Sequence, residues 1–94
     1  GLKYTVDPKA PAGSRVSDVQ VQAADGSWGP IDLAASYGVV SNNYVRNGGD
    51  GFAMFITADK AYDFGPDLAD VVADYMAANG PYQPYLDGRI TIKE

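Results

Sequence analysis

The stretch SNNYVRNGGDGF, residues 41–52, holds three asparagines, three glycines and a single aspartate. Such a composition is typical of a tight turn between strands, because glycine and asparagine tolerate positive φ angles. It equally fits a ligand-binding loop, because adjacent glycines let a ligand approach the backbone closely. In that case Asp50 would accept hydrogen bonds from paired hydroxyls such as those of a ribose, and Tyr44 would offer a ring for stacking. The residues alone leave both interpretations open.

Three better-known glycine- and aspartate-rich loops do not fit this stretch. An EF-hand needs carboxylates at several alternate positions and a terminal Glu, whereas Asp50 stands alone. Calcium-binding nonapeptide repeats need many tandem copies, and the chain has one. A dinucleotide-binding loop requires G-x-G-x-x-G between a strand and a helix, and the glycines here are spaced differently.

The composition of the whole chain narrows the function classes. Its 94 residues are enough for one domain, and 46% hydrophobic with 20% charged residues is typical of a globular protein. The net charge of −5 and the scattered Lys and Arg disfavour nucleic acid and anionic membranes as partners. The chain has no cysteine and no histidine, which excludes disulfides, thiolate–metal sites and His-based catalytic pairs. We expect no catalytic residue, metal site or cofactor in this chain, and no apolar run is long enough for a membrane span.

Upstream of the quoted stretch the pattern is that of a sheet. Alternation of apolar and polar residues predicts strands at residues 2–6 and 16–21. Asp25-Gly26 predicts a hairpin with a type I′ turn. The return segment begins at Trp28, a predicted packing anchor, and is expected to break at Gly29-Pro30.

Closer to the quoted stretch, the strand and helix signals are mixed. Residues 37–40 are predicted as a strand that leads straight into it. The run at 52–56 fits helix or strand equally, and we expect Phe52 and Phe55 to lie in the core.

Downstream, one helix is clearly predicted. Apolar residues at helical spacing, Pro66 in the first turn and early acidic residues predict a helix that Asn79-Gly80-Pro81 ends. Residues 89–93 alternate and predict a closing strand. The fold class is therefore α+β, with a mixed sheet and one main C-terminal helix.

The chain resembles a known family over nearly its whole length. YGVVSNNY at 37–44 followed by NGGDGF at 47–52 is similar to the C-terminal domain of the 5′-nucleotidase / UDP-sugar hydrolase family. The family pattern there is Y-x-V-x-x-N-x-F, a short spacer, and G-G-D-G before Phe or Tyr. GLKYTVD at 1–7, DVVADY at 70–75 and DGRI at 87–90 resemble other family segments in the same order.

The resemblance implies roles for single residues. Tyr44 falls where the family carries the second of two rings that clamp the base, usually Phe, and Asp50 falls where an aspartate binds the ribose hydroxyls. Asn43 would line the base pocket, and Gly48 and Gly49 would belong to the substrate-binding loop. The family's first ring and its substrate-binding arginines would lie upstream of Gly1, and Arg46 matches none of them.

The resemblance also implies a division of labour. In this family a separate N-terminal metallophosphoesterase domain carries two divalent metal ions, while the C-terminal domain recognises the nucleoside or nucleotide. We expect the 94 residues to be the second half of that C-terminal domain, inactive alone, within a periplasmic or extracellular hydrolase. The alternative is a stand-alone binding, adhesion or structural module that kept the fold without the nucleotide pocket. A homodimer formed through the face that the first half would cover is a further expectation.

Overall fold

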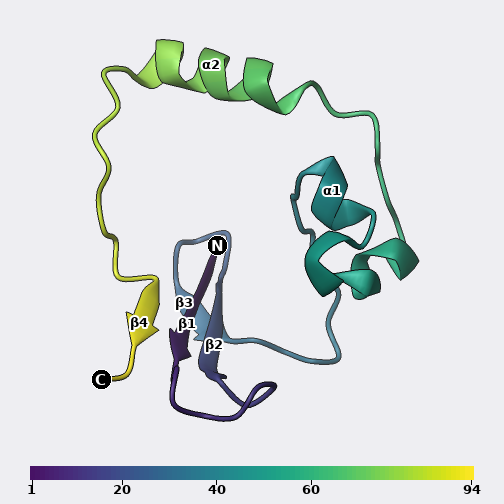
Figure 1. Cartoon of the computed structure of the whole chain (residues 1–94). Helices are drawn as coiled ribbons and strands as arrows, with labels where there is room; N and C mark the ends of the chain where they lie inside the picture. Colours follow the sequence, from purple (N-terminus) through teal and green to yellow (C-terminus); the bar gives the residue numbers. More distant parts are fainter. The chain divides into compact units, whose positions relative to one another are not determined.

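The computed structural model describes all 94 residues, which fall into two compact units. One unit combines residues 1–36 with residues 84–94, and the other contains residues 37–83. The first unit holds the sheet and the second holds the helices, which confirms the α+β class (Figure 1).

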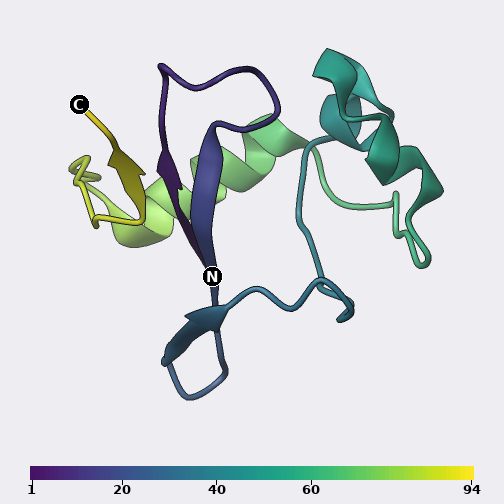
Figure 2. The same ribbon diagram turned by 90° about the horizontal axis from the view of Figure 1, so that it is seen from below.

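The first unit is a mixed sheet with the strand order β3-β2-β1-β4. Its strands are β1 (Leu2–Val6), β2 (Val16–Gln22), β3 (Trp28–Pro30) and β4 (Ile90–Ile92). β1 and β2 pair antiparallel, as do β2 and β3, whereas β4 pairs parallel to β1. The first and last segments of the chain are therefore neighbours in the sheet, and the strands predicted at both ends are confirmed (Figures 1 and 2).

An irregularity in β2 sets which residues share a face. Leu2 pairs with Val21 and Val6 pairs with Val16, so the register slips by one residue between the two pairs. Asp18 adopts a left-handed φ of 52° within the slipped stretch, the mark of a β-bulge. Val16 and Val21 are an odd number of residues apart and would otherwise face opposite sides. The bulge lets both face the same side.

As a result the sheet has one apolar face. Cross-strand partners lie on the same side of a sheet, and this side carries Leu2, Tyr4, Val6, Val16, Val21, Ile90 and Ile92. The other face carries Lys3, Gln20 and Trp28, where the Lys3 Nζ lies 4.7 Å from the centre of the Trp28 ring. No residue of the chain is buried, and Ile92 on the apolar face is 65% exposed. The first unit by itself has no second layer over this apolar face.

The hairpin between β2 and β3 lies where it was predicted, but its turn type differs. The Ala23 N–H donates to the Ser27 carbonyl at 2.8 Å, so the loop has three residues. Gly26 alone has a positive φ, 88°, whereas a type I′ turn also needs one at Asp25. The Asp25 carboxylate accepts the Ser27 N–H and hydroxyl at 2.9 and 2.6 Å, which favours this Asx geometry over type I′.

Gly29-Pro30 does not interrupt the return strand, contrary to the prediction. Gly29 pairs with Val21 and Pro30 pairs with Gln20. Proline is tolerated here because β3 is an edge strand, where one side of the backbone needs no ladder partner.

The second unit contains four helical elements and no strand. They are α1 (Asn43–Arg46), the 3-10 turns η1 (Gly49–Gly51) and η2 (Ala53–Thr57), and α2 (Leu68–Asn79). The strand predicted at 37–40 is wrong. A strand needs a neighbouring strand to share backbone hydrogen bonds, and residues 37–40 have none, although their β-branched residues favour a strand. The quoted stretch is likewise no hairpin turn, since it forms helical turns instead.

The run at 52–56 forms η2 and not a buried element. Phe52 and Phe55 stack with ring centroids 5.8 Å apart and an interplanar angle of 6°. Phe52 nevertheless remains 42% exposed, so its placement in a core is wrong, and Phe55 is only half-buried. The two rings therefore stack on each other without being buried.

The helix predicted from the apolar spacing is confirmed as α2, but Pro66, expected in its first turn, lies before the N-cap. Asp67 caps it by accepting the Ala69 N–H at 2.9 Å, and it ends at Asn79, before Gly80-Pro81. Its apolar stripe forms a shallow hollow lined by Val71, Val72, Tyr75, Met76 and Tyr82. Neither α1 nor α2 has the length and apolar character needed to cross a membrane.

Candidate functional site

The helix α1 holds Tyr44 in place although it has a single turn. The Asn42 side chain accepts the Val45 N–H at 2.9 Å and so caps the first turn. The Asn42 carbonyl accepts the Arg46 N–H, and the Asn43 carbonyl accepts the Asn47 N–H, both at 3.0 Å. The Asn42 side chain and these backbone hydrogen bonds therefore close one helical turn around Tyr44.

The loop after α1 relies on left-handed backbone. Gly48, Asp50 and Gly51 have φ angles of 89°, 54° and 81°. A Cβ on Gly48 would also lie 2.7 Å from Ile56 Cδ1, but that side-chain end can move, so the positive φ is the main reason for glycine here. Asp50 is not a glycine, and aspartate is one of the few residues that visit this region. A non-glycine residue held there is a feature often found at binding sites.

Tyr44, Gly49 and Asp50 come together in this loop. The Tyr44 hydroxyl donates to Asp50 Oδ1 at 3.2 Å. A Cβ on Gly49 would lie 2.5 to 2.6 Å from three consecutive ring atoms of Tyr44. Such near-equal distances place that Cβ over the face of the ring and not at its edge. Gly49 therefore lets the backbone cover one ring face, while Tyr44 as a whole remains 58% exposed.

The structure gives less information on the predicted roles of Gly48 and Asn43. Gly48 shapes the loop but contacts Ile56 and not the Tyr44 ring. The Asn43 carbonyl accepts the Asn47 side-chain amide at 2.7 Å, and the Asn43 side chain is exposed. Its part in a base pocket stays a prediction.

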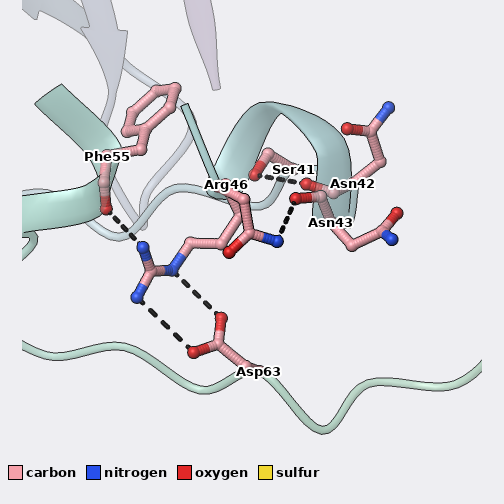
Figure 3. A network of polar contacts seen from close by, with 7 residues as sticks. Ser41, Asn42, Asn43, Arg46, Phe55 and Asp63 are labelled. Carbon is pink, nitrogen blue, oxygen red and sulfur yellow. Dashed lines mark hydrogen bonds and ion pairs between the residues drawn. The ribbon is translucent and has the colours of Figure 1, made fainter. Parts of the chain in front are cut away.

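Arg46 links three segments of the second unit (Figure 3). Its Nη1 donates to the Phe55 carbonyl at 2.6 Å, its Nε lies 3.0 Å from Asp63 Oδ1, and its Nη2 donates to Asp63 Oδ2 at 3.5 Å. The Arg46 side chain is 25% exposed, lower than that of Asp63. The guanidinium is engaged by its own chain.

This Arg46 contact was missed by reasoning from the sequence. Asp63 lies 17 residues downstream, beyond any local periodicity, so no pattern pointed to the pair. The Asn42 cap did have a signal, because asparagine before a short apolar turn is a common N-cap.

The chemistry available at this site is that of binding. An exposed aromatic face beside a carboxylate can hold a flat heterocycle that carries hydroxyl groups. No cluster of three or more Asp or Glu side chains is arranged to hold a metal ion.

Comparison with known proteins places the chain in a family. Residues 1–57 match the sequence profile described as "5'-nucleotidase, C-terminal domain". The chain belongs to this family. The match includes β1 to β3 and all of the Tyr44–Asp50 loop, and it confirms the resemblance found in the sequence.

Individual members of the family are similar over nearly the whole chain. A 5'-nucleotidase from Diplobatis ommata is 33% identical over 100% of this chain. A trifunctional nucleotide phosphoesterase protein from Bacillus subtilis is 30% identical over 96% of it. The crystal structure of a 5'-nucleotidase precursor from Thermus thermophilus matches 98% of the chain at 41% identity with a TM-score of 0.87.

The chain is much shorter than these family members. It spans 17% of the Diplobatis ommata protein, 6% of the Bacillus subtilis protein and 18% of the Thermus thermophilus chain. It therefore corresponds to one part of larger 5'-nucleotidase-type proteins.

Proposed function

We propose that this chain is the nucleoside-recognising part of a 5′-nucleotidase-type metallophosphoesterase. The observation that carries the proposal is the arrangement of Tyr44 and Asp50, six residues apart in sequence and joined by a hydrogen bond above Gly49. An aromatic face and a carboxylate are the two groups needed to recognise a base and a ribose.

In this proposal the base stacks on the ring face of Tyr44 that Gly49 does not cover. Base–aromatic stacking contributes about 1–3 kcal/mol per base. The ribose hydroxyls donate to Asp50, whose Oδ2 has no partner within the chain. We further propose that Asn43, next to Tyr44 on α1, lines the edge of the base.

The hydrolysis itself is assigned to a different domain of the whole protein. The chain has no histidine and no cluster of three acidic side chains, so its residues do not fit a site for two divalent metal ions. We assign such ions to an N-terminal metallophosphoesterase domain and the whole enzyme to the periplasm or the outside of the cell. The names of the relatives, which include a nucleotide phosphoesterase and an apyrase from Tabanus yao, support hydrolysis by the whole protein.

The uncovered apolar surfaces fit a chain that works as part of a domain. Within its own unit, the apolar face of the sheet has no cover, and neither has the α2 stripe, and large exposed apolar patches mark interaction sites. We assign residues 1–94 to the second half of the C-terminal domain, with the first half covering these surfaces.

The proposal is tested by replacing Asp50 in the whole protein. In Asp50→Ala the KM for adenosine 5′-monophosphate should rise about 10- to 150-fold, because hydrogen bonds to a charged group contribute about 1.5–3 kcal/mol. The kcat should change much less, since ribose contacts far from phosphorus bind ground and transition states alike.

The matched control for this variant is Asp59→Ala. Asp59 is an exposed acidic residue of the same unit and lies outside the Tyr44–Asp50 loop. Its replacement removes the same charge and should leave KM unchanged. A collapse of kcat in Asp50→Ala with KM unaltered would show that Asp50 is not a ribose contact.

A further inference from the structure

The hydroxyl of Tyr44 makes a contact that stacking does not require. A ring alone suffices to stack on a base. In this chain the hydroxyl lies 3.2 Å from Asp50 Oδ1 and donates a hydrogen bond to it.

The acceptor of this hydrogen bond, the Asp50 side chain, has few other contacts that fix it. Asp50 is exposed, and its carboxylate accepts no other hydrogen bond from the chain. The left-handed backbone at Asp50 fixes where its side chain leaves the loop, but not how the carboxylate turns about its own bonds. The Tyr44 hydroxyl is the group that fixes this rotation.

The hydroxyl is itself fixed by the ring. The ring lies flat over the Gly49 backbone, because the missing Cβ leaves space there. Gly49, the Tyr44 ring, the Tyr44 hydroxyl and Asp50 thus form a chain of contacts within one loop.

We propose that Tyr44 is a positioning residue that orients the Asp50 carboxylate toward the ribose hydroxyls of the ligand. This inference rests on the proposed function and adds a role for the hydroxyl. An ionised carboxylate has about four lone-pair sites. Asp50 can therefore keep the hydrogen bond from Tyr44 and still accept from two ribose hydroxyls. Holding the carboxylate before binding lowers the entropy cost of fixing it on binding.

The test compares a ribose ligand with one that lacks the hydroxyls. In the whole protein, Tyr44→Phe keeps the ring and removes only the hydroxyl. The KM for adenosine 5′-monophosphate should rise about threefold to tenfold, the range of one ordinary hydrogen bond. The KM for 2′,3′-dideoxyadenosine 5′-monophosphate should stay within about twofold of the unmodified protein, because Asp50 has no hydroxyl to accept from.

Two further variants sharpen the result. Tyr62→Phe removes the hydroxyl of another exposed tyrosine in the same unit and should change neither KM. In the double variant Tyr44→Phe with Asp50→Ala, losing the Tyr44 hydroxyl should add nothing to the loss from Asp50→Ala alone.

Three outcomes would overturn the inference. An equal rise of KM for both ligands would assign the hydroxyl to the stack or to the loop structure. Tighter binding of the ribose ligand would show that the hydroxyl competes for Asp50. An unchanged KM for the ribose ligand would show that the hydroxyl has no role in binding. The proposed function fails separately, if Asp50→Ala leaves the preference for ribose over dideoxyribose unaltered.

Discussion

The sheet and the loop that carries Tyr44 are built on different principles. In the sheet, seven apolar side chains share one face, and many weak, similar contacts define the structure. In residues 42–57, three particular features define it: the Asn42 cap, the Arg46 contacts and the glycines that admit the Tyr44 ring. Single substitutions should therefore matter more in the loop than in the sheet.

Among the substitutions that compare the loop with the sheet, the largest effect is expected from Gly49→Ala in the whole protein. The added Cβ would lie 2.5 Å from Tyr44 Cε1, so the ring must move away. The exposed ring can swing outward at little cost in stability, but it then loses both its stacking position and its hydrogen bond to Asp50. The KM for adenosine 5′-monophosphate should rise about 10- to 100-fold, since the stack alone contributes about 1–3 kcal/mol.

Gly38→Ala serves as the control for this substitution. An added Cβ at Gly38 meets no atom within 4 Å. It should leave KM unchanged. An unaltered KM in Gly49→Ala would mean that the position of the ring over Gly49 is not part of the binding site.

A smaller effect, on the local stability of the loop, is expected from Arg46→Ala. The matching substitution in the sheet unit is Arg15→Ala. Both arginines donate to a backbone carbonyl, Arg46 to Phe55 at 2.6 Å and Arg15 to Ala10 at 2.9 Å. Arg46 is half-buried and also pairs with Asp63, whereas Arg15 is exposed. Losing Arg46 should lower the local stability of the loop by about 1–2 kcal/mol, and losing Arg15 by less than about 0.5 kcal/mol.

Hydrogen exchange of the amides between Gly48 and Ala58 measures this difference. Arg46→Ala should speed their exchange about 5- to 30-fold, in line with the loss of stability. Arg15→Ala should leave it unchanged. Equal behaviour of the two variants would contradict the idea that the loop depends on single contacts.

The smallest expected effect is a dependence of hairpin stability on pH, through the carboxyl group of Asp25. Hydrogen bonds from the Ser27 hydroxyl and backbone N–H lower the pKa of Asp25 below its ordinary value. A lowered pKa in the folded state means that the hairpin gains stability above the unfolded pKa of about 3.9 and loses it as the pH falls through the folded pKa. Carbon-13 NMR titration should give a pKa below about 3.9 for Asp25, and Ser27→Ala should raise it.

The sheet could be predicted from the sequence because its signals are periodic. Alternation predicted β1, β2 and β4, and helical spacing with early acidic residues predicted α2. Residues 37–40 have the composition of a strand but no partner, and partners are set by tertiary structure that a local pattern does not contain. The bulge at Asp18, which puts Val16 and Val21 on one face, also has no local signal.

The candidate site could be predicted only in part. The family resemblance pointed to Tyr44 and Asp50, and the structure brings the two side chains together. The hydroxyl contact follows from the ring lying over Gly49, which depends on backbone angles that sequence composition does not fix. The pairing of Arg46 with Asp63 spans 17 residues, and nothing in the sequence distinguishes Asp63 from the other aspartates.

The most direct test of the account is a crystal structure of the whole protein with adenosine bound. The account predicts that the base stacks on the open face of Tyr44, opposite Gly49, with its ring roughly 3.5 Å away. The ribose hydroxyls should donate to Asp50 while the Tyr44 hydroxyl keeps its hydrogen bond to Oδ1. Adenosine bound with its base away from Tyr44, or with its ribose out of reach of Asp50, would contradict the proposed function.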